Sequence, residues 1–152
     1  MPIYSVGMYA ADCTDPSELV NAISDKHGLE VHSLVSALKF KRARDAAPLK
    51  HIGTNFHNVA TIVQTKKFNA FVRAVRVEVE LHWHMKPGMD MNLVLYCNNG
   101  RHRSVLAGDA MARIMRELKY NVRGPVHLSR ANWKAMCSTC DDCKPSELNR
   151  LI

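Results

Sequence analysis

The stretch Leu93-Val94-Leu95-Tyr96-Cys97-Asn98-Asn99-Gly100-Arg101-His102-Arg103-Ser104-Val105 decides the fold of this chain. An apolar run precedes a short loop that contains a glycine, and an amphipathic segment follows the loop, so the order predicts strand, turn and helix. Cys97 closes the strand and the pair Arg103-Ser104 opens the helix. Backbone N–H groups, a guanidinium and a thiol are therefore directed at one point, which suits an anion and above all a phosphate group.

The segments around this stretch predict an α/β fold with a mixed, mostly parallel sheet flanked by helices. The strand–phosphate-loop–helix unit spans 91–119. Residues 121–127 predict the next strand, so strand, helix and strand form a parallel crossover unit. Residues 3–9 predict a first strand.

Helix signals surround these strands. Thr14 or Asp15 is a candidate cap for a helix over 16–27, and Gly28 is a stop signal. The pattern over 31–40 fits a helical face or a short strand. Residues 55–84 have a helical pattern, with a separation into two pieces near Thr65.

Composition and charge limit the class of protein. The chain has 152 residues, enough for one domain over 1–152, and a formal net charge of +7 with His neutral. That charge favours nucleic acid or phosphorylated ligands. A membrane-spanning helix needs a run of about 18 apolar residues, and the sequence contains none, so no membrane span is predicted. The beginning of the sequence lacks a signal-peptide pattern, and the cysteines are not spaced as a disulfide framework. We therefore expect an intracellular, reducing compartment, cytoplasmic or nuclear.

The spacing from Cys97 to Arg103 and Ser104 matches the C-x5-R-[ST] loop of protein tyrosine phosphatases. In such a loop the thiolate is a nucleophile, and the arginine holds two phosphate oxygens. Ser104 is then a donor to the sulfur or a helix cap. A general acid is also required, and Asp12, Asp15 and Asp90 are candidates. The alternative is a structural, half-buried cysteine at a strand end.

A longer resemblance covers the same loop. Residues 97–105 resemble the C-T-G-G-x-H-R-S-V signature of the C-terminal domain of the RapZ family, with Asn98 and Asn99 in place of Thr-Gly. Thr14 stands where that family has an early arginine. The resemblance implies an α/β RNA-binding module whose loop holds phosphate through Asn98, Asn99, Gly100, Arg101, His102, Arg103 and Ser104.

Function therefore stays open between classes. The first expectation is a non-catalytic domain that binds phosphate ligands and RNA, with basic or polar contacts from Lys41, Arg42, Arg44, Arg123, His127 and Arg130. The alternative is a cysteine-dependent phosphatase with Cys97 as nucleophile and Arg103 as clamp. A protein-interaction module is the third. Because the chain contains no G-x4-G-K-[ST] sequence, no nucleotide cofactor is expected.

The cysteine-rich segment 137–145 near the end of the sequence carries a separate signal. Cys137, Cys140 and Cys143 form two overlapping C-x2-C steps, a spacing that brings thiolates onto one zinc ion. A fourth ligand would come from His127, Cys13 or another histidine. The alternative is a reduced tail or a redox pair.

Other side chains have structural interpretations. The methionines at 85, 89, 91, 111, 115 and 136 have the character of core residues. Tyr96 and Trp133 fit partial core burial better than base stacking.

Overall fold

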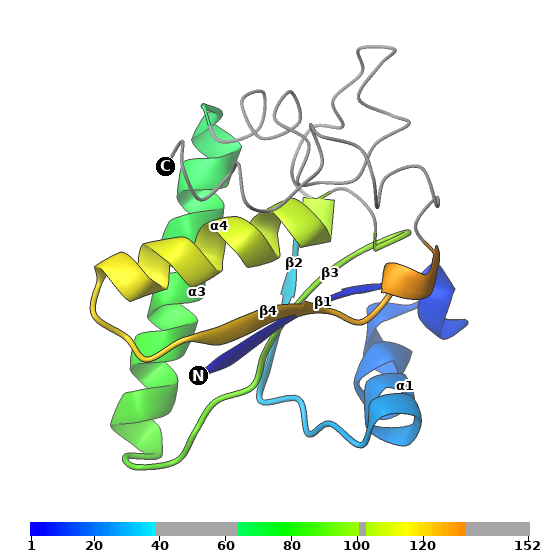
Figure 1. The fold of residues 1–152 in the computed structure, drawn as a ribbon, viewed down its shortest axis with the longest axis horizontal. Coiled ribbons are helices and arrows are strands. Elements are labelled where there is room, and N and C mark those ends of the chain that lie inside the picture. The colour runs from blue at the N-terminus through cyan, green and yellow to red at the C-terminus, as the bar shows by residue number, and fades with distance from the viewer. Residues whose placement is uncertain (39–63, 101–102, 133–152) are drawn as a thin grey trace.

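The described part of the chain, residues 1–38, 64–100 and 103–132 of a computed structural model, is built on a four-stranded sheet (Figure 1). The strands are β1 (Pro2–Gly7), β2 (Ser33–Ser36), β3 (Leu93–Cys97) and β4 (Arg123–His127), in the order β2-β3-β1-β4. The helices are α1 (Pro16–His27), α3 (Lys66–Met85) and α4 (Arg103–Glu117), with short 3-10 helices η1 (Tyr9–Ala11) and η3 (Arg130–Asn132). The α/β class is confirmed, and all three strand pairings are parallel.

Local signals explain where two of the helices begin. The Asp15 carboxylate accepts a hydrogen bond from the Ser17 N–H at 2.8 Å, and Gly28 ends α1 with a φ of 61°. Thr65 caps α3, because its hydroxyl accepts from the Phe68 N–H at 3.2 Å. Thr65 therefore begins a helix, as a break at this point of the pattern predicts. Residues 55–63 lie outside the described residues.

The ambiguous segment 31–40 contains strand β2. It pairs with β3 in parallel, with Leu34 opposite Val94 and Val35 opposite Leu95. A short apolar run fits the pattern of a helix as well as that of a strand. Here the segment is a strand because its backbone groups form hydrogen bonds with those of β3.

Two apolar clusters cover the two faces of the sheet. Alternate residues of β3 point to opposite faces. Leu93 and Leu95 pack with α3 and α4, whereas Val94 and Tyr96 pack with Leu19 and the rest of the apolar side of α1. Figure 1 accordingly shows α4 and α1 on opposite sides of the sheet. β3 is buried at all of its positions between helices on both faces, which explains why its residues are apolar throughout, whereas Pro2 and Tyr4 of β1 are only half-buried.

The order of connections creates a switch point at the centre of the sheet. β1 and β3 are adjacent, but the chain leaves β1 for α1 on one face and leaves β3 for α4 on the other. In open parallel sheets, ligands bind in the crevice outside the carboxyl ends of such strands. The fold therefore directs attention to the loops that follow Gly7 and Cys97.

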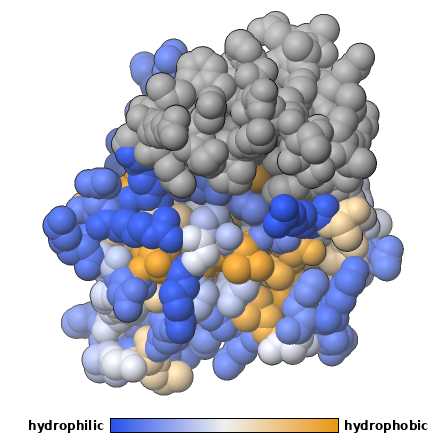
Figure 2. Space-filling view, viewed as in Figure 1, coloured by the Kyte–Doolittle hydropathy of each residue, from blue (hydrophilic) through white to orange (hydrophobic). Residues whose placement is uncertain are grey.

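Burial corrects part of the expectation for the methionines. Met91, Met111 and Met115 are in the core, but Met85 and Met89 are 69% and 54% exposed, and Met136 lies outside the described residues. Tyr96 is buried, which matches its predicted place in the core. On the face seen in Figure 2, patches of apolar surface lie among hydrophilic side chains. Within the described residues, no helix combines the length and apolar character needed to cross a membrane.

Candidate functional site

The loop after β3 leaves the sheet at its centre. Gly7 and Cys97 are paired at the carboxyl ends of β1 and β3. Beyond them the two chains stay together, because the Met8 and Tyr9 N–H groups donate to the Cys97 and Asn98 carbonyls, both at 2.9 Å. The loop therefore runs beside the start of η1 before it enters α4 at Arg103. In open parallel sheets this is the region where ligands bind.

Two glycines let the loop lie close to β1. Gly100 has a φ of 68°, a left-handed conformation that L side chains rarely adopt. A Cβ on Gly100 would lie 2.6 Å from the Gly7 nitrogen and 2.7 Å from the Ser129 Cβ. A Cβ on Gly7 would overlap the backbone of Asn99 and Gly100. The close backbone approach fixes the turn of the loop above the end of β1.

The Cys97 sulfur lies inside this turn. The residue is buried, its Sγ is 3.1 Å from the Ser104 Oγ, and the Gly100 N–H donates to the sulfur at 3.3 Å. The Ser104 side chain is thus directed at the thiol, one of the two roles predicted for it. The Ser104 hydroxyl and the Gly100 N–H are thus two hydrogen-bond partners of the Cys97 sulfur.

Arg103 connects the loop with the neighbouring strand. It is the first residue of α4, and its Nη1 donates to the Leu38 carbonyl at 2.8 Å, just beyond the end of β2. The guanidinium is therefore held at the carboxyl edge of the sheet, on the same edge as the Cys97 turn. A planar fork at this place suits recognition of a phosphate group.

The structure brings together only part of the predicted site. Asn98, Asn99, Gly100, Arg103 and Ser104 share the carboxyl edge, and Arg130 follows β4 at the same edge. The remaining loop and basic residues of the prediction lie outside the described residues: Arg101, His102, Lys41, Arg42 and Arg44.

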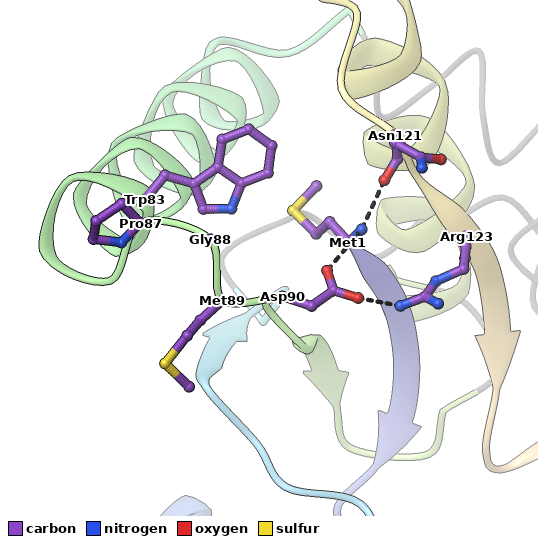
Figure 3. Close-up of a pocket in the computed structure, with 8 residues that line it drawn as sticks. All are labelled: Met1, Trp83, Pro87, Gly88, Met89, Asp90, Asn121 and Arg123. Atoms are coloured by element: carbon purple, nitrogen blue, oxygen red, sulfur yellow. Dashed lines mark hydrogen bonds and ion pairs between the residues drawn. The ribbon is translucent and has the colours of Figure 1, made fainter.

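Arg123 lies at the opposite edge. It begins β4 and pairs with Asp90, whose carboxylate also contacts the Met1 ammonium at 3.0 Å (Figure 3). The hydrogen bond from the Met1 ammonium is the main cause that holds the pKa of Asp90 below its usual value. These groups line a cavity of about 560 Å³ with Trp83 and Met89. Arg123 and Asp90 are thus both separated from the Cys97 loop by the length of the strands.

His127 is part of an internal polar chain. Its Nδ1 is 2.6 Å from the Ser5 Oγ, and its Nε2 is 3.4 Å from the Asp109 Oδ1. Ser5 is buried beneath α4, so this chain connects β1, β4 and α4. The position of His127 indicates a structural role between these elements, although it was predicted as a nucleic-acid contact.

The three carboxylates proposed as a general acid differ in their distance from the Cys97 loop. Asp90 is at the wrong edge of the sheet, and Asp15 caps α1. Asp12 directly follows η1, whose first residue, Tyr9, is hydrogen-bonded to Asn98 of the loop. Asp12 is therefore the candidate whose backbone lies nearest to the Cys97 turn along these contacts.

The predicted zinc ligands Cys137, Cys140 and Cys143 lie outside the described residues. Across residues 1–38, 64–100 and 103–132, no group of three His, Cys, Asp or Glu side chains could hold a metal ion. Cys13, a predicted fourth ligand, is buried, and its thiol donates to the Ala11 carbonyl at 3.3 Å. Burial raises the pKa of that thiol, with Glu18 and Asp12 adding to the effect. Zinc binding stays a prediction, which elemental analysis of protein purified without chelators checks.

Sequence reasoning missed Gly7 and Ser129. The Gly7 N–H donates to the Ser129 Oγ at 2.9 Å in a buried contact. Ser129 therefore packs beneath the loop, against both Gly7 and Gly100. A glycine at a strand end was the available signal, since it often marks a close backbone approach.

Comparison with models of known protein families found no match, and neither did comparison with curated proteins. Membership of the RapZ family therefore stays a prediction that rests on the resemblance of the loop.

Proposed function

We propose that the loop 98–104 binds a phosphate group, and that the ligand is RNA or a phosphorylated small molecule. One observation carries the proposal: the buried Cys97 turn, with the Gly100 N–H and the Ser104 hydroxyl directed into it, lies at the switch point between β1 and β3. Arg103 enters from the first turn of α4. An anion beside the Cys97 turn would meet the amino-terminal end of α4 and the Arg103 guanidinium.

RNA is supported by charge. The chain has a formal net charge of +7, and Arg103 and Arg130 share the loop's edge of the sheet. An RNA strand carries one phosphate per nucleotide, so one phosphate would occupy the loop while neighbouring phosphates contact outer basic residues. Such binding weakens as salt increases, because bound cations are released from the RNA.

The test measures the affinity of a labelled single-stranded RNA across a salt series. Arg103→Ala should weaken binding at least tenfold and reduce the salt slope by about one charge. Arg103→Lys keeps the charge and loses the fork, so its affinity should fall between those of the wild type and Arg103→Ala.

Arg123→Ala is the matched control, because it removes the same charge at the opposite edge. It should change affinity far less than Arg103→Ala. Equal losses in the two variants would show diffuse charge attraction without a loop site. Salt-independent binding, or none, would contradict the RNA proposal.

A second function, a cysteine-dependent phosphatase, is favoured by the two groups directed at the Cys97 sulfur. The thiolate would attack phosphorus, forming an S–P bond as the P–O bond to the leaving group breaks. The leaving oxygen would take a proton from Asp12, and water would then release inorganic phosphate and regenerate the thiol. Phosphate-bound Arg103 would stabilise the charge of the transition state.

Turnover of an aryl phosphate separates the two functions. An enzyme should lose turnover in Cys97→Ser and in Arg103→Ala, and Asp12→Asn should lower it by about 10²-fold or more. Asp15→Asn, which keeps a helix cap, is the control for the carboxylate. Retained RNA binding by Cys97→Ser, without wild-type turnover, supports the binding domain.

A further inference from the structure

The outer face of α3 carries a second apolar stripe. The inner face packs on the sheet through Phe68, Phe71, Val75 and Val79. On the exposed surface of the helix, away from this inner face, apolar residues recur at spacings of three and four, which places them on one line of the helix. They are Ala70, Ala74, Val77, Leu81 and Met85, and all are exposed.

The exposure of the large members is high. Val77 is 61% exposed, Leu81 54% and Met85 69%. A helix that covers a sheet normally turns polar side chains to the solvent, as α3 does with Arg73, Glu80 and His84, so an exposed apolar line beside these residues needs an explanation. The spacing is that of a seam between two packed helices.

The order of residue sizes along this stripe is directional. Small residues, Ala70 and Ala74, occupy the amino-terminal half. Large residues, Leu81 and Met85, occupy the carboxyl-terminal half, with Val77 between them. If a second identical helix runs antiparallel, with the two Val77 residues adjacent, Ala74 faces Leu81 and Ala70 faces Met85. Each layer then pairs one small with one large side chain, so the helix axes keep an even separation.

Charge beside the stripe has the same directional order. Arg73 and Glu80 flank it on one side, three or four residues before and after Val77. The antiparallel arrangement places Arg73 opposite Glu80 of the second copy, twice per dimer. Within one copy Glu80 also contacts Arg76 at 3.9 Å, but that pair is exposed and long, so it competes weakly.

We infer that the outer face of α3 is a homodimer interface, in which α3 of a second copy packs antiparallel about Val77. We name a second copy as the partner because an identical antiparallel helix presents its large residues to the small ones of this helix, and Glu80 to Arg73. α3 is already packed on the sheet, so pairing does not have to provide the free energy of helix formation. The interface is independent of the Cys97 loop.

The oligomeric state of the full chain tests this inference, measured by sedimentation equilibrium over about 1–100 μM protein. The wild type should be a dimer at the upper end. Val77→Arg places two like charges together at the two-fold axis, and should weaken dimerisation about a hundredfold or more. Because Val77 is exposed within a copy, the variant should keep its circular dichroism spectrum.

Two further variants sharpen the test. Val126→Arg is the matched control, since Val126 is a 49% exposed valine on β4, away from α3, and it should leave the dimer unchanged. Arg73→Glu and Glu80→Arg should each weaken dimerisation by about tenfold, and the double variant should restore it, because the pair is reversed as a unit.

A wild type that stays monomeric over this range overturns the inference. So does a dimer that tolerates Val77→Arg, or one that loses affinity equally with Val126→Arg. Failure of the double variant to recover affinity overturns the antiparallel register.

Discussion

Gly100 lies against Gly7 with no space for a side chain at either position. A Cβ on Gly100 would be 2.6 Å from the Gly7 nitrogen, closer than real side chains approach backbone atoms. The contact joins the carboxyl end of β1 to the turn around the Cys97 sulfur. The shape of the candidate site therefore depends on a missing side chain as much as on its polar groups.

Gly100→Ala should consequently destabilise the chain and disturb the loop. Gly88→Ala is a matched control: Gly88 also has a positive φ, 81°, but a Cβ there meets nothing within 4 Å. Both variants incur backbone strain of about 1 kcal/mol, and Gly100→Ala adds about 1–3 kcal/mol for the overlap with Gly7 and Ser129. Urea unfolding measures the difference. Equal free energies of unfolding for the two variants would contradict the close approach.

The contact between Ser5 and His127 supports a second prediction. Ser5→Ala leaves the His127 Nδ1 without its 2.6 Å partner beneath α4, and should lower the free energy of unfolding by about 1–2 kcal/mol. Ser24→Ala is the control, because Ser24 is exposed within α1, away from the Asp15 cap. Its effect should stay within about 0.5 kcal/mol. A Ser5→Ala variant as stable as the wild type would show that the hydroxyl is dispensable.

Much of the fold was predictable from local pattern. The apolar run before Cys97, the loop glycine and the amphipathic segment after it correspond to β3, the turn and α4. These signals are local in sequence, so the strand, turn and helix could be identified without the sheet. The choice of strand for 33–36 depends on pairing with β3, a partner about 60 residues away that no local pattern contains.

The candidate site was predictable only in its central part. The C-x5-R-S spacing predicts the Cys97–Ser104 contact, because both residues belong to one short loop. It does not predict Ser129 beneath the loop, or the separation of Arg123 from it, since both depend on how β4 is placed beside β1. Charge clusters in sequence likewise do not tell which edge of a sheet a residue occupies.

The two sides of α3 allow a direct comparison of one substitution. Val79 is fully buried in the core, whereas Val77 is 61% exposed. Val79→Ala should lower the free energy of unfolding by about 1–3 kcal/mol through lost burial and a residual cavity. Val77→Ala should change it by less than about 0.5 kcal/mol when measured at a concentration where the chain is monomeric. Equal losses would contradict the assignment of the two faces.

The cap of α1 makes stability depend on pH. The hydrogen bond from the Ser17 N–H lowers the pKa of Asp15, so the folded state holds the carboxylate more strongly than the unfolded chain does. That contribution is fully present above the unfolded pKa of about 4, and is lost as the pH falls through the folded pKa. Asp15→Ala should therefore be less stable than the wild type at neutral pH, with a difference that shrinks in acid.

Urea unfolding of the wild type, Asp15→Ala and Asp15→Asn from about pH 7 to pH 3 measures this dependence. Asparagine keeps an oxygen that accepts the Ser17 N–H without titrating, so Asp15→Asn should remain close to the wild type at neutral pH. It should also lose less stability in acid than the wild type does. A gap between the wild type and Asp15→Ala that stays constant over this range would mean that the ionised carboxylate does not contribute to the cap.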